Sequence, residues 1–548
     1  MSLRFRAAWV AALVLGSFSS AYASDSNEEQ SLGELRNTIV NLLQTMVEKG
    51  LLTREQAEQL VKQAQTKAAA DAQARAAQNA ATAKEEEGAV RVPYVPQIVK
   101  DEISKQVAKE VQPAVVAGVV KEAKEEGWGI PGSLPEWLSR VRVYGDVQVR
   151  EQSDIYSKDN DAVFDFNAIN LAGGFPKTTF PYLDTTHDRN RLRLRARLGV
   201  EGDITPTWRA VIRLASGALN DPSSESQTFG TYGQRYNVGI DLGYIQWESA
   251  PLGHLAHMTA EGGRVPNPWF SPTELIYARD LTFEGVATTF RWGWGAKDPD
   301  ASHVFATFGG FPALEVPLVN QDNKWLVGGQ LGTNLRWGSG GRQHFRFAGA
   351  YYDFLNFSGK LNDPNAPGLT NYTAPAFIRY GNTPFDISNN PADNTVNLFA
   401  LAAHFRLVDL AALYQFDFPG YSLALTGEAV RNIGYNRAQV EALSNQTMPS
   451  DENKGYVTEV SFGRPLVDSF GKWRAAVGYR YVKRDAVIDA WTDADFHGGG
   501  TNAQGYYFWT TFGLAPNTTV RVRYMSANEV DGPRFGLDIV QVDVNARF

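Results

Sequence analysis

Arginine and apolar residues alternate strictly between Arg191 and Arg197, and this is the most regular pattern in the chain. Successive side chains of an extended strand point to opposite faces, so the stretch predicts a strand with guanidinium groups on one face and hydrocarbon on the other. A helix would spread both kinds of side chain around its circumference. Such a strand fits a soluble sheet with one solvated face, or a membrane barrel with lipid outside and water inside.

The same period of two returns at both ends of the region 139–548. The valines of residues 141–149 alternate with polar residues, and near the end of the chain Val540, Val542, Val544 and the terminal Phe548 share one face. A strand that ends on an aromatic terminal residue resembles the insertion signal of Gram-negative outer-membrane proteins. Phe548 is therefore a candidate assembly signal.

Short turns and long loops alternate between these two ends. The expected short turns are 205–206, 250–253, 296–300, 338–342, 418–420, 465–471 and 516–517, and the expected long loops are 154–188, 216–236, 264–279, 311–323, 356–394, 435–454, 485–504 and 529–534. Counting the strands between them gives about sixteen, as in an all-β transmembrane barrel of antiparallel strands. Aromatic residues near the strand ends suggest two interfacial girdles, with Trp247, Trp292, Trp325, Trp337, Tyr351, Phe416, Tyr481 and Trp509 as candidates.

The first residues predict export. Arg4 and Arg6 precede an apolar run at 7–15, and Ala21 and Ala23 give the small-residue pattern of a signal-peptidase site, so residues 1–23 are expected to be a signal peptide. The apolar run is too short to cross a bilayer, and no other stretch has the roughly 20 apolar residues that a spanning helix needs. A membrane location would therefore require a barrel.

Residues 24–127 follow a helical period instead. Leu35, Ile39 and Leu42 recur at helical spacing up to Gly50, and residues 53–56 look like a capping box for a second helix. We expect a helical periplasmic segment that self-associates as a coiled coil, and a disordered linker is the alternative. Residues 128–138, which contain Trp128, Pro131, Pro135 and Trp137, form the expected junction to the barrel.

The chain resembles the bacterial putative-porin family, in which a signal peptide and a helical periplasmic segment precede an outer-membrane barrel. The resemblance rests on residues 143–150 (VYGDVQVR), 263–268 (GRVPNP) and 280–286 (DLTFEGV), together with the terminal Phe548. It implies a diffusion pore without naming a solute. By analogy with general porins, it also implies a trimer in outer-membrane lipid.

Alternation then assigns one set of charged side chains to the interior of the barrel. The candidate pore-lining residues are Arg142, Asp146, Arg191, Arg193, Arg195, Arg197, Arg209, Arg213, Asp241, Glu284, Arg336, Arg346, Glu428, Glu459, Arg474, Arg480, Arg521 and Arg523. In a water-filled pore, such arginines attract anions and repel cations, so we expect weak to moderate anion selectivity. Alternatively, the arginines pair with the interior acids and only stabilise the wall.

Residues 264–279 are the candidate for a loop folded into the channel, because Pro266, Pro268 and Pro272 stiffen them between two well-patterned strands. An external loop is the alternative. The residues expected to narrow the channel are Arg264, Trp269, Phe270, Tyr277 and Arg279.

The composition excludes several other classes of function. The absence of cysteine excludes disulfide frameworks and thiolate metal sites, and the net charge of −8 does not suggest a nucleic-acid partner. His254 and His257 would point to opposite faces of a strand, and no nucleophile elbow surrounds a serine, so neither a cofactor, a metal site nor an enzyme is expected.

Two functions remain after these exclusions. The leading hypothesis is a porin for small hydrophilic solutes that is inserted by the barrel-assembly machinery. The second is a structural tether, in which the helical segment binds peptidoglycan or sister subunits and the barrel is its membrane anchor.

Overall fold

The computed structural model describes residues 140–548, except 177–178, 250–255, 294–300, 319–320 and 390–396. The expected signal peptide (1–23), helical segment (24–127) and junction (128–138) lie outside the described residues, and so does His254. Among the described residues, no helix is both long and apolar enough to cross a membrane.

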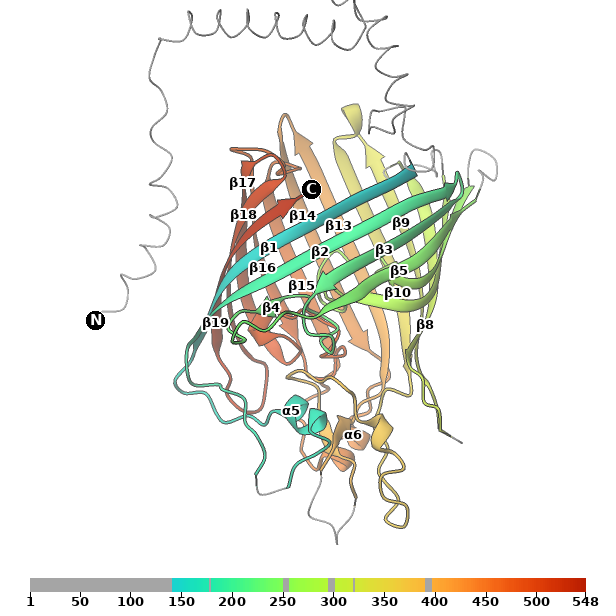
Figure 1. Ribbon diagram of the computed structural model, residues 1–548. Coiled ribbons are helices and arrows are strands. Elements are labelled where there is room, and N and C mark those ends of the chain that lie inside the picture. Colours follow the sequence, from blue (N-terminus) through green and yellow to red (C-terminus); the bar gives the residue numbers. More distant parts are fainter. Residues whose placement is uncertain (1–139, 177–178, 250–255, 294–300, 319–320, 390–396) are drawn as a thin grey trace, which may run out of the picture. The chain divides into compact units, whose positions relative to one another are not determined.

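Sixteen long strands form one closed antiparallel barrel (Figure 1). In chain order they are β1 (Val141–Tyr156), β2 (Arg189–Thr205), β3 (Trp208–Ser216), β5 (Val238–Glu248), β6 (Ala256–Pro266), β7 (Thr282–Trp292), β8 (His303–Leu314), β9 (Lys324–Trp337), β10 (Gln343–Leu355), β13 (Phe405–Phe418), β14 (Tyr421–Asn432), β15 (Lys454–Gly463), β16 (Trp473–Val482), β17 (Ala503–Ala515), β18 (Thr518–Glu529) and β19 (Leu537–Arg547). The two-residue β4 (Gln227–Thr228) pairs with β2. The expected all-β barrel is therefore confirmed, with the expected number of strands.

Pairing between the first and last long strands closes the barrel. Each long strand pairs with the next one along the chain, and β1 pairs with both β2 and β19. Gly145 and Phe548 exchange two backbone hydrogen bonds of 3.0 Å at this seam. The sheet consequently has no open edge, which is a requirement for a β-structure that crosses hydrocarbon.

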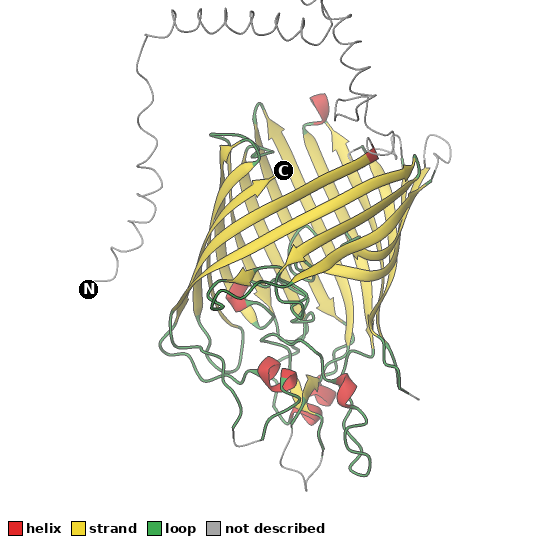
Figure 2. Cartoon of the chain, viewed as in Figure 1, coloured by secondary structure: helices red, strands yellow, loops and turns green. Residues whose placement is uncertain are grey.

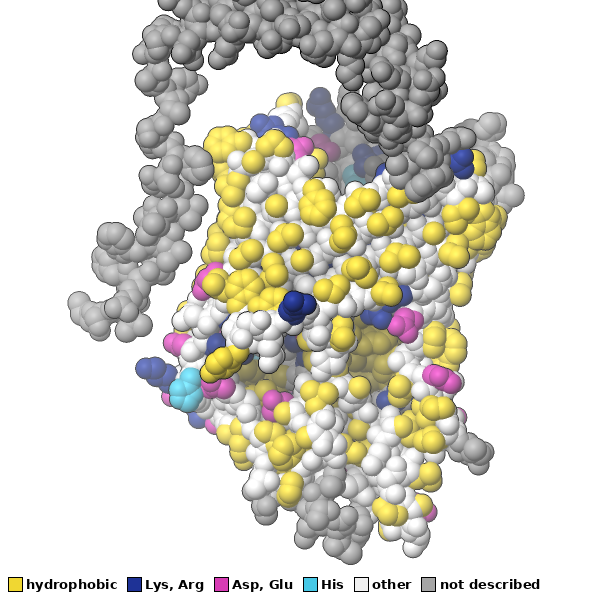
Figure 3. Space-filling model, viewed as in Figure 1, with side chains coloured by type: hydrophobic (Ala, Val, Ile, Leu, Met, Phe, Trp, Pro, Cys, Tyr) yellow, Lys and Arg dark blue, Asp and Glu magenta, His cyan; other side chains and the backbone are white. Residues whose placement is uncertain are grey.

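The two faces of the wall follow the alternation of the sequence. On β1, Val143 is 62% exposed and Val149 is 41% exposed. The two neighbours of Val149 in the sequence, Gln148 and Arg150, are buried on the inner face. On the side of the barrel shown in Figure 3, apolar side chains are spread over the wall between the two rims. Seven of the eight aromatic girdle candidates lie on this outer face, and Trp509 lies on the inner face with Tyr507, between the exposed Tyr506 and Phe508. The girdle prediction is therefore wrong for Trp509.

Short turns lie at one end of the barrel and long loops at the other. The loop end carries α5 (Phe166–Leu171), α6 (Arg437–Ser444) and the small hairpin of β11 (Pro384–Asp386) and β12 (Phe399–Leu401). Figure 2 shows most of the helices gathered at this end. Side chains from several loops, including Leu275, Phe357, Ile387 and Ile488, share one apolar cluster with the inner wall. The loops therefore pack into the mouth of the barrel.

Gly145 gives the first test of the seam. A side chain at this position would place its Cβ 2.6 Å from the backbone oxygen of Arg197 and against the ring of Phe548. We expect Gly145→Val to destabilise the folded barrel by about 1–3 kcal/mol, because β1 must shift away from β2. The temperature at which the folded form is lost on semi-native gels should fall.

Gly202→Val is the matched control on the neighbouring strand. A Cβ at Gly202 meets only a methyl group of Val141, at 3.8 Å. Equal unfolding temperatures for both variants would contradict the tight packing assigned to the seam.

Candidate functional site

Residues 267–281, here called the inner loop, cross the inside of the barrel. The Phe270 N–H donates to Oε1 of Gln330 over 2.7 Å, and Nε2 of Gln330 donates back to the Phe270 carbonyl over 3.0 Å. Further along, the Thr273 N–H donates to Glu428 over 3.1 Å, and Arg480 donates to the Glu274 carbonyl over 2.9 Å. The loop thus follows the inner wall from β9 through β14 to β16, so residues after Pro266 fold inward rather than outward.

The aromatic side chains of the inner loop face the wall. Trp269, Phe270 and Tyr277 are all buried, and the rings of Trp269 and Tyr277 lie 5.2 and 5.3 Å from the ring of Tyr352. These three residues anchor the loop and do not themselves line the lumen, contrary to the expectation from the sequence. Arg279 differs, because its side chain is 64% exposed and pairs with Glu274 over 3.3 Å.

Arg264 and Glu284 are also placed differently from the expectation. Val265 pairs in register with Phe283, and both side chains are buried against the interior, whereas Arg264 pairs with Glu284 on the opposite face. Their charged groups form an ion pair of 2.7 Å, and the Glu284 side chain is 61% exposed. Glu284 therefore does not line the lumen, whereas Arg264, in the wall before the inner loop, also lines a cavity that Asp241 and Asp280 share.

The arginine ladder, defined as Arg191, Arg193, Arg195 and Arg197, lies on the inner face of β2 and is matched by acids. Arg191 pairs with Asp154 over 2.7 Å, and Arg193 approaches Asp495 to 3.9 Å. The last two arginines share partners: Arg195 contacts Asp146 (3.1 Å) and Asp280 (3.2 Å), and Arg197 contacts Asp146 (2.6 Å), Glu225 (3.4 Å) and Asp280 (3.8 Å). Because each guanidinium has a carboxyl partner, the ladder is a row of ion pairs.

Most other interior arginines next to the ladder are also paired. The pairs are Arg142 with Glu201 (2.6 Å), Arg150 with Asp543 (2.6 Å), Arg209 with Asp203 (2.7 Å) and Arg213 with Asp241 (2.7 Å). Arg346 stacks over Phe270 and Phe305, and Arg336 lies at the short-turn end of the inner face.

Two loop carboxyl groups complete this network. Burial would raise the pKa of Asp495, but the surrounding guanidinium groups of Arg150, Arg523 and Arg193 lower that pKa far below its usual value. Burial, together with the neighbouring carboxyl groups of Asp241 and Asp280, raises the pKa of Glu225. Asp495 therefore stays anionic among three arginines, whereas Glu225 binds a proton more readily than a solvated carboxylate.

The wall of β15–β18 is less completely paired. Arg480 approaches Asp493 to 3.9 Å and Arg523 pairs with Asp495 over 3.2 Å. In contrast, Arg474 donates only to the Ser461 hydroxyl, and among the described residues no carboxylate lies within ion-pair distance of Arg474. Arg521, on the same wall, stacks over Trp509.

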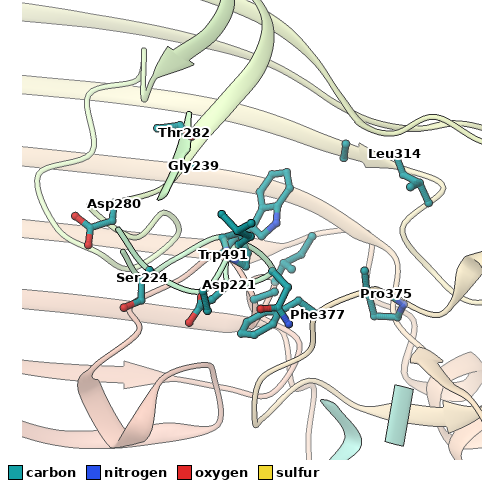
Figure 4. Close-up of a pocket in the computed structure, with 18 of the residues that line it drawn as sticks. Asp221, Ser224, Gly239, Asp280, Thr282, Leu314, Pro375, Phe377 and Trp491 are labelled. Atoms are coloured by element: carbon teal, nitrogen blue, oxygen red, sulfur yellow. The ribbon is translucent and has the colours of Figure 1, made fainter. Parts of the chain in front are cut away.

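A cavity of about 730 Å³ lies at the loop end beside the ladder (Figure 4). Asp221, Ser224 and Asp280 lie toward one side of the view, and Leu314 and Pro375 toward the other, with Trp491 and Phe377 between them. Asp221 pairs with Arg379 over 2.7 Å, and Asp280 pairs with the ladder. The cavity therefore has a polar side next to the arginines and an apolar side under the loops.

Sequence reasoning missed most acids that pair with the arginines. Asp154 carries a detectable signal, because its position on β1 continues the polar face that contains Asp146. Asp280, Glu225 and Asp495 lie in long loops, where no local periodicity indicates which way a side chain points. No group of three or more potential metal ligands was found among the described residues, which include His257.

Comparison with known proteins gives one family. A family model described as putative porin matches residues 36–548 of the chain. A search of curated proteins found no match to the chain.

Three solved structures are similar over most of their length. OprB of Pseudomonas putida has 11% identity and a TM-score of 0.42, covering 75% of this chain and 96% of that chain. OmpF of Salmonella typhi, solved with daunomycin, has 13% identity and a TM-score of 0.38, covering 74% and 97%. The outer membrane channel DcaP of Acinetobacter baumannii has 11% identity and a TM-score of 0.36, also covering 74% and 97%.

Gln330 allows the anchoring of the inner loop to be tested. Gln330→Ala removes both hydrogen bonds to Phe270, each worth about 1 kcal/mol. We expect hydrogen–deuterium exchange of the amides in residues 267–281 to accelerate by roughly thirtyfold, which corresponds to about 2 kcal/mol. Mass spectrometry of peptides from this segment measures the change.

Gln415→Ala is the control, because Gln415 also lies on the inner face but its side chain donates to Asp417. Unchanged exchange in Gln330→Ala would show that this contact does not hold the loop.

Proposed function

The chain belongs to the putative porin family, and we propose that it forms a passive outer-membrane channel for small hydrophilic solutes with weak to moderate anion selectivity. The observation that carries the proposal is a closed barrel whose inner face is charged and crossed by the inner loop. An apolar outer face matches lipid, and a polar inner face holds water. Solutes would pass between the inner loop and the wall.

The source of selectivity in this proposal is the part of the lumen whose charges are incompletely compensated. An ion pair acts on a distant solute as a dipole, so its effect falls off faster with distance than that of a single charge. The ladder therefore contributes less than its four arginines suggest. Arg474, which has no carboxylate within ion-pair distance among the described residues, is the stronger candidate for attracting anions, and its effect should weaken as salt shortens the Debye length to about 10 Å at 0.1 M.

We also propose that the protein is a homotrimer inserted by the barrel-assembly machinery, with Phe548 as part of the insertion signal. The broad apolar outer surface supports contact with lipid and with other subunits (Figure 3). The position of Phe548 at the seam supports a role in closing the barrel, because its backbone pairs with Gly145. Peptidoglycan binding by residues 24–127 stays a prediction from the sequence.

Reversal potentials in planar bilayers across a tenfold KCl gradient test the channel proposal. Wild-type protein should conduct and show a potential of the anion-selective sign. Arg474→Gln should shift that potential by several millivolts toward cation selectivity, because it removes a charge that no carboxylate within ion-pair distance offsets.

The double variant Arg191→Gln/Asp154→Asn is the matched comparison, since it removes a whole ion pair. Its reversal potential should stay close to that of the wild type. Cation selectivity of the wild-type channel, or a larger shift in the double variant than in Arg474→Gln, would contradict the proposal.

A further inference from the structure

A small pocket lies between the tip of the inner loop and the wall of β14–β18. Its volume is about 100 Å³, and its lining includes Thr273 and Arg279 from the inner loop and Glu459, Trp509 and Arg521 from the wall. It lies on a different part of the wall from the ladder of β2. Solutes that pass under the inner loop would reach it.

The charges of this pocket pair off with two exceptions. Three of its arginines have carboxylate partners: Arg279 with Glu274 (3.3 Å), Arg480 with Asp493 (3.9 Å) and Arg523 with Asp495 (3.2 Å). Arg521 and Glu459 also line the pocket, and no ion pair within the described part of the chain includes either of them. Arg279 and Arg474 act on Glu459 only at longer range. The pocket thus holds one cation and one anion that have no oppositely charged partner within ion-pair distance among the described residues.

Trp509 contacts both charged groups, Arg521 at the face of its indole ring and Glu459 at the N–H edge. The Arg521 guanidinium carbon lies 4.4 Å from the ring centroid, over its face. The indole N–H donates to Oε2 of Glu459 over 2.9 Å. The guanidinium and the carboxylate therefore approach the same indole from different directions, and no ion pair between them is found among the described residues.

Two partly buried charges of opposite sign, each without an oppositely charged partner, favour a ligand that supplies both counter-charges. Arg521 and Glu459 are each half-buried, so each has lost part of its hydration. A carboxylate can accept two parallel hydrogen bonds from a guanidinium group, and an ammonium group can donate to a carboxylate. We propose that this pocket is a binding subsite for small zwitterions of the α-amino-acid class, with the ligand carboxylate on Arg521 and the ligand ammonium on Glu459.

The proposed orientation also determines which solutes bind poorly. A simple carboxylate would approach Glu459 without an ammonium group to offset the repulsion, and a simple amine would approach Arg521 in the same way. The volume of the pocket suits the charged head of the ligand, whereas a larger side chain would extend into the lumen. The subsite therefore selects the zwitterionic head and tolerates different side chains.

This inference rests on the proposed channel function, because a subsite inside the lumen has a role only if solutes reach it. Transient binding there would raise the local concentration of zwitterions at the narrow part of the channel. Equilibrium binding, measured without a membrane, tests the subsite separately from conduction.

Saturation-transfer NMR on the purified full chain in detergent micelles provides that test with three probes of similar size. L-Alanine carries both charges, propionate lacks the ammonium group, and L-alaninamide lacks the carboxylate. For wild-type protein, we expect the apparent affinity for L-alanine to exceed that for either other probe by at least about tenfold, which corresponds to about 1.4 kcal/mol.

Two variants should change the preference and not only weaken binding. Glu459→Gln should weaken L-alanine binding and strengthen propionate binding, because the repelling carboxylate is gone. Arg521→Gln should weaken L-alanine binding and strengthen L-alaninamide binding. A general loss of structure would weaken all three probes together, so this reversal distinguishes recognition from unfolding.

Arg209→Gln and Glu201→Gln are controls of the same residue types that lie outside the pocket and pair elsewhere. They should retain the wild-type preference. Equal affinities of the wild type for all three probes, or an unchanged order of preference in both pocket variants, would overturn the subsite. If the protein binds L-alanine as described but does not conduct, the subsite stands and the channel proposal fails.

Discussion

Closure of the backbone hydrogen-bond ladder is the constraint on which the rest of this structure depends. A membrane interior offers no water to an unpaired N–H or C=O group, so a spanning sheet must pair its first strand with its last. Here β1 closes the sheet, because it pairs with β2 on one side and with β19 on the other. At this seam the backbone of Phe548 is hydrogen-bonded to that of Gly145. Once the wall is closed, alternation divides each strand into a lipid-facing and an interior face.

The interior is organised by a second constraint, which is compensation of charge. Arginine stays protonated when it is buried, so an interior crowded with arginine must supply acids nearby. Asp146 and Asp154 come from the adjacent strand, whereas Asp280 and Asp495 come from loops that fold into the barrel. The ladder is thus most conspicuous in the sequence but is largely neutralised, and the charges available to a solute lie on the β15–β18 wall.

The sequence predicted the strands, their number and the alternation of turns and loops, because these features follow from local period and turn residues. The prediction from the sequence failed where a loop packs against the inner face of the wall and changes which side chains point inward. Glu284 was expected to line the lumen, but Phe283 packs inward against Tyr277, so Glu284 points outward. Trp509 was assigned to a girdle, although its N–H binds an interior carboxylate. The direction of a loop side chain such as Asp495 depends on packing between segments that are distant in the sequence. No local sequence pattern indicates this packing.

Single-cysteine labelling on β2 tests the division of faces most directly, because the natural chain contains no cysteine. Leu192→Cys and Arg191→Cys differ by one position, and the exposed Leu192 lies on the outer face. In lipid vesicles, a charged, water-soluble thiol reagent should modify Arg191→Cys, and a fluorophore at Leu192→Cys should be quenched by nitroxide-labelled acyl chains. Fast labelling of Leu192→Cys together with protection of Arg191→Cys would contradict the account.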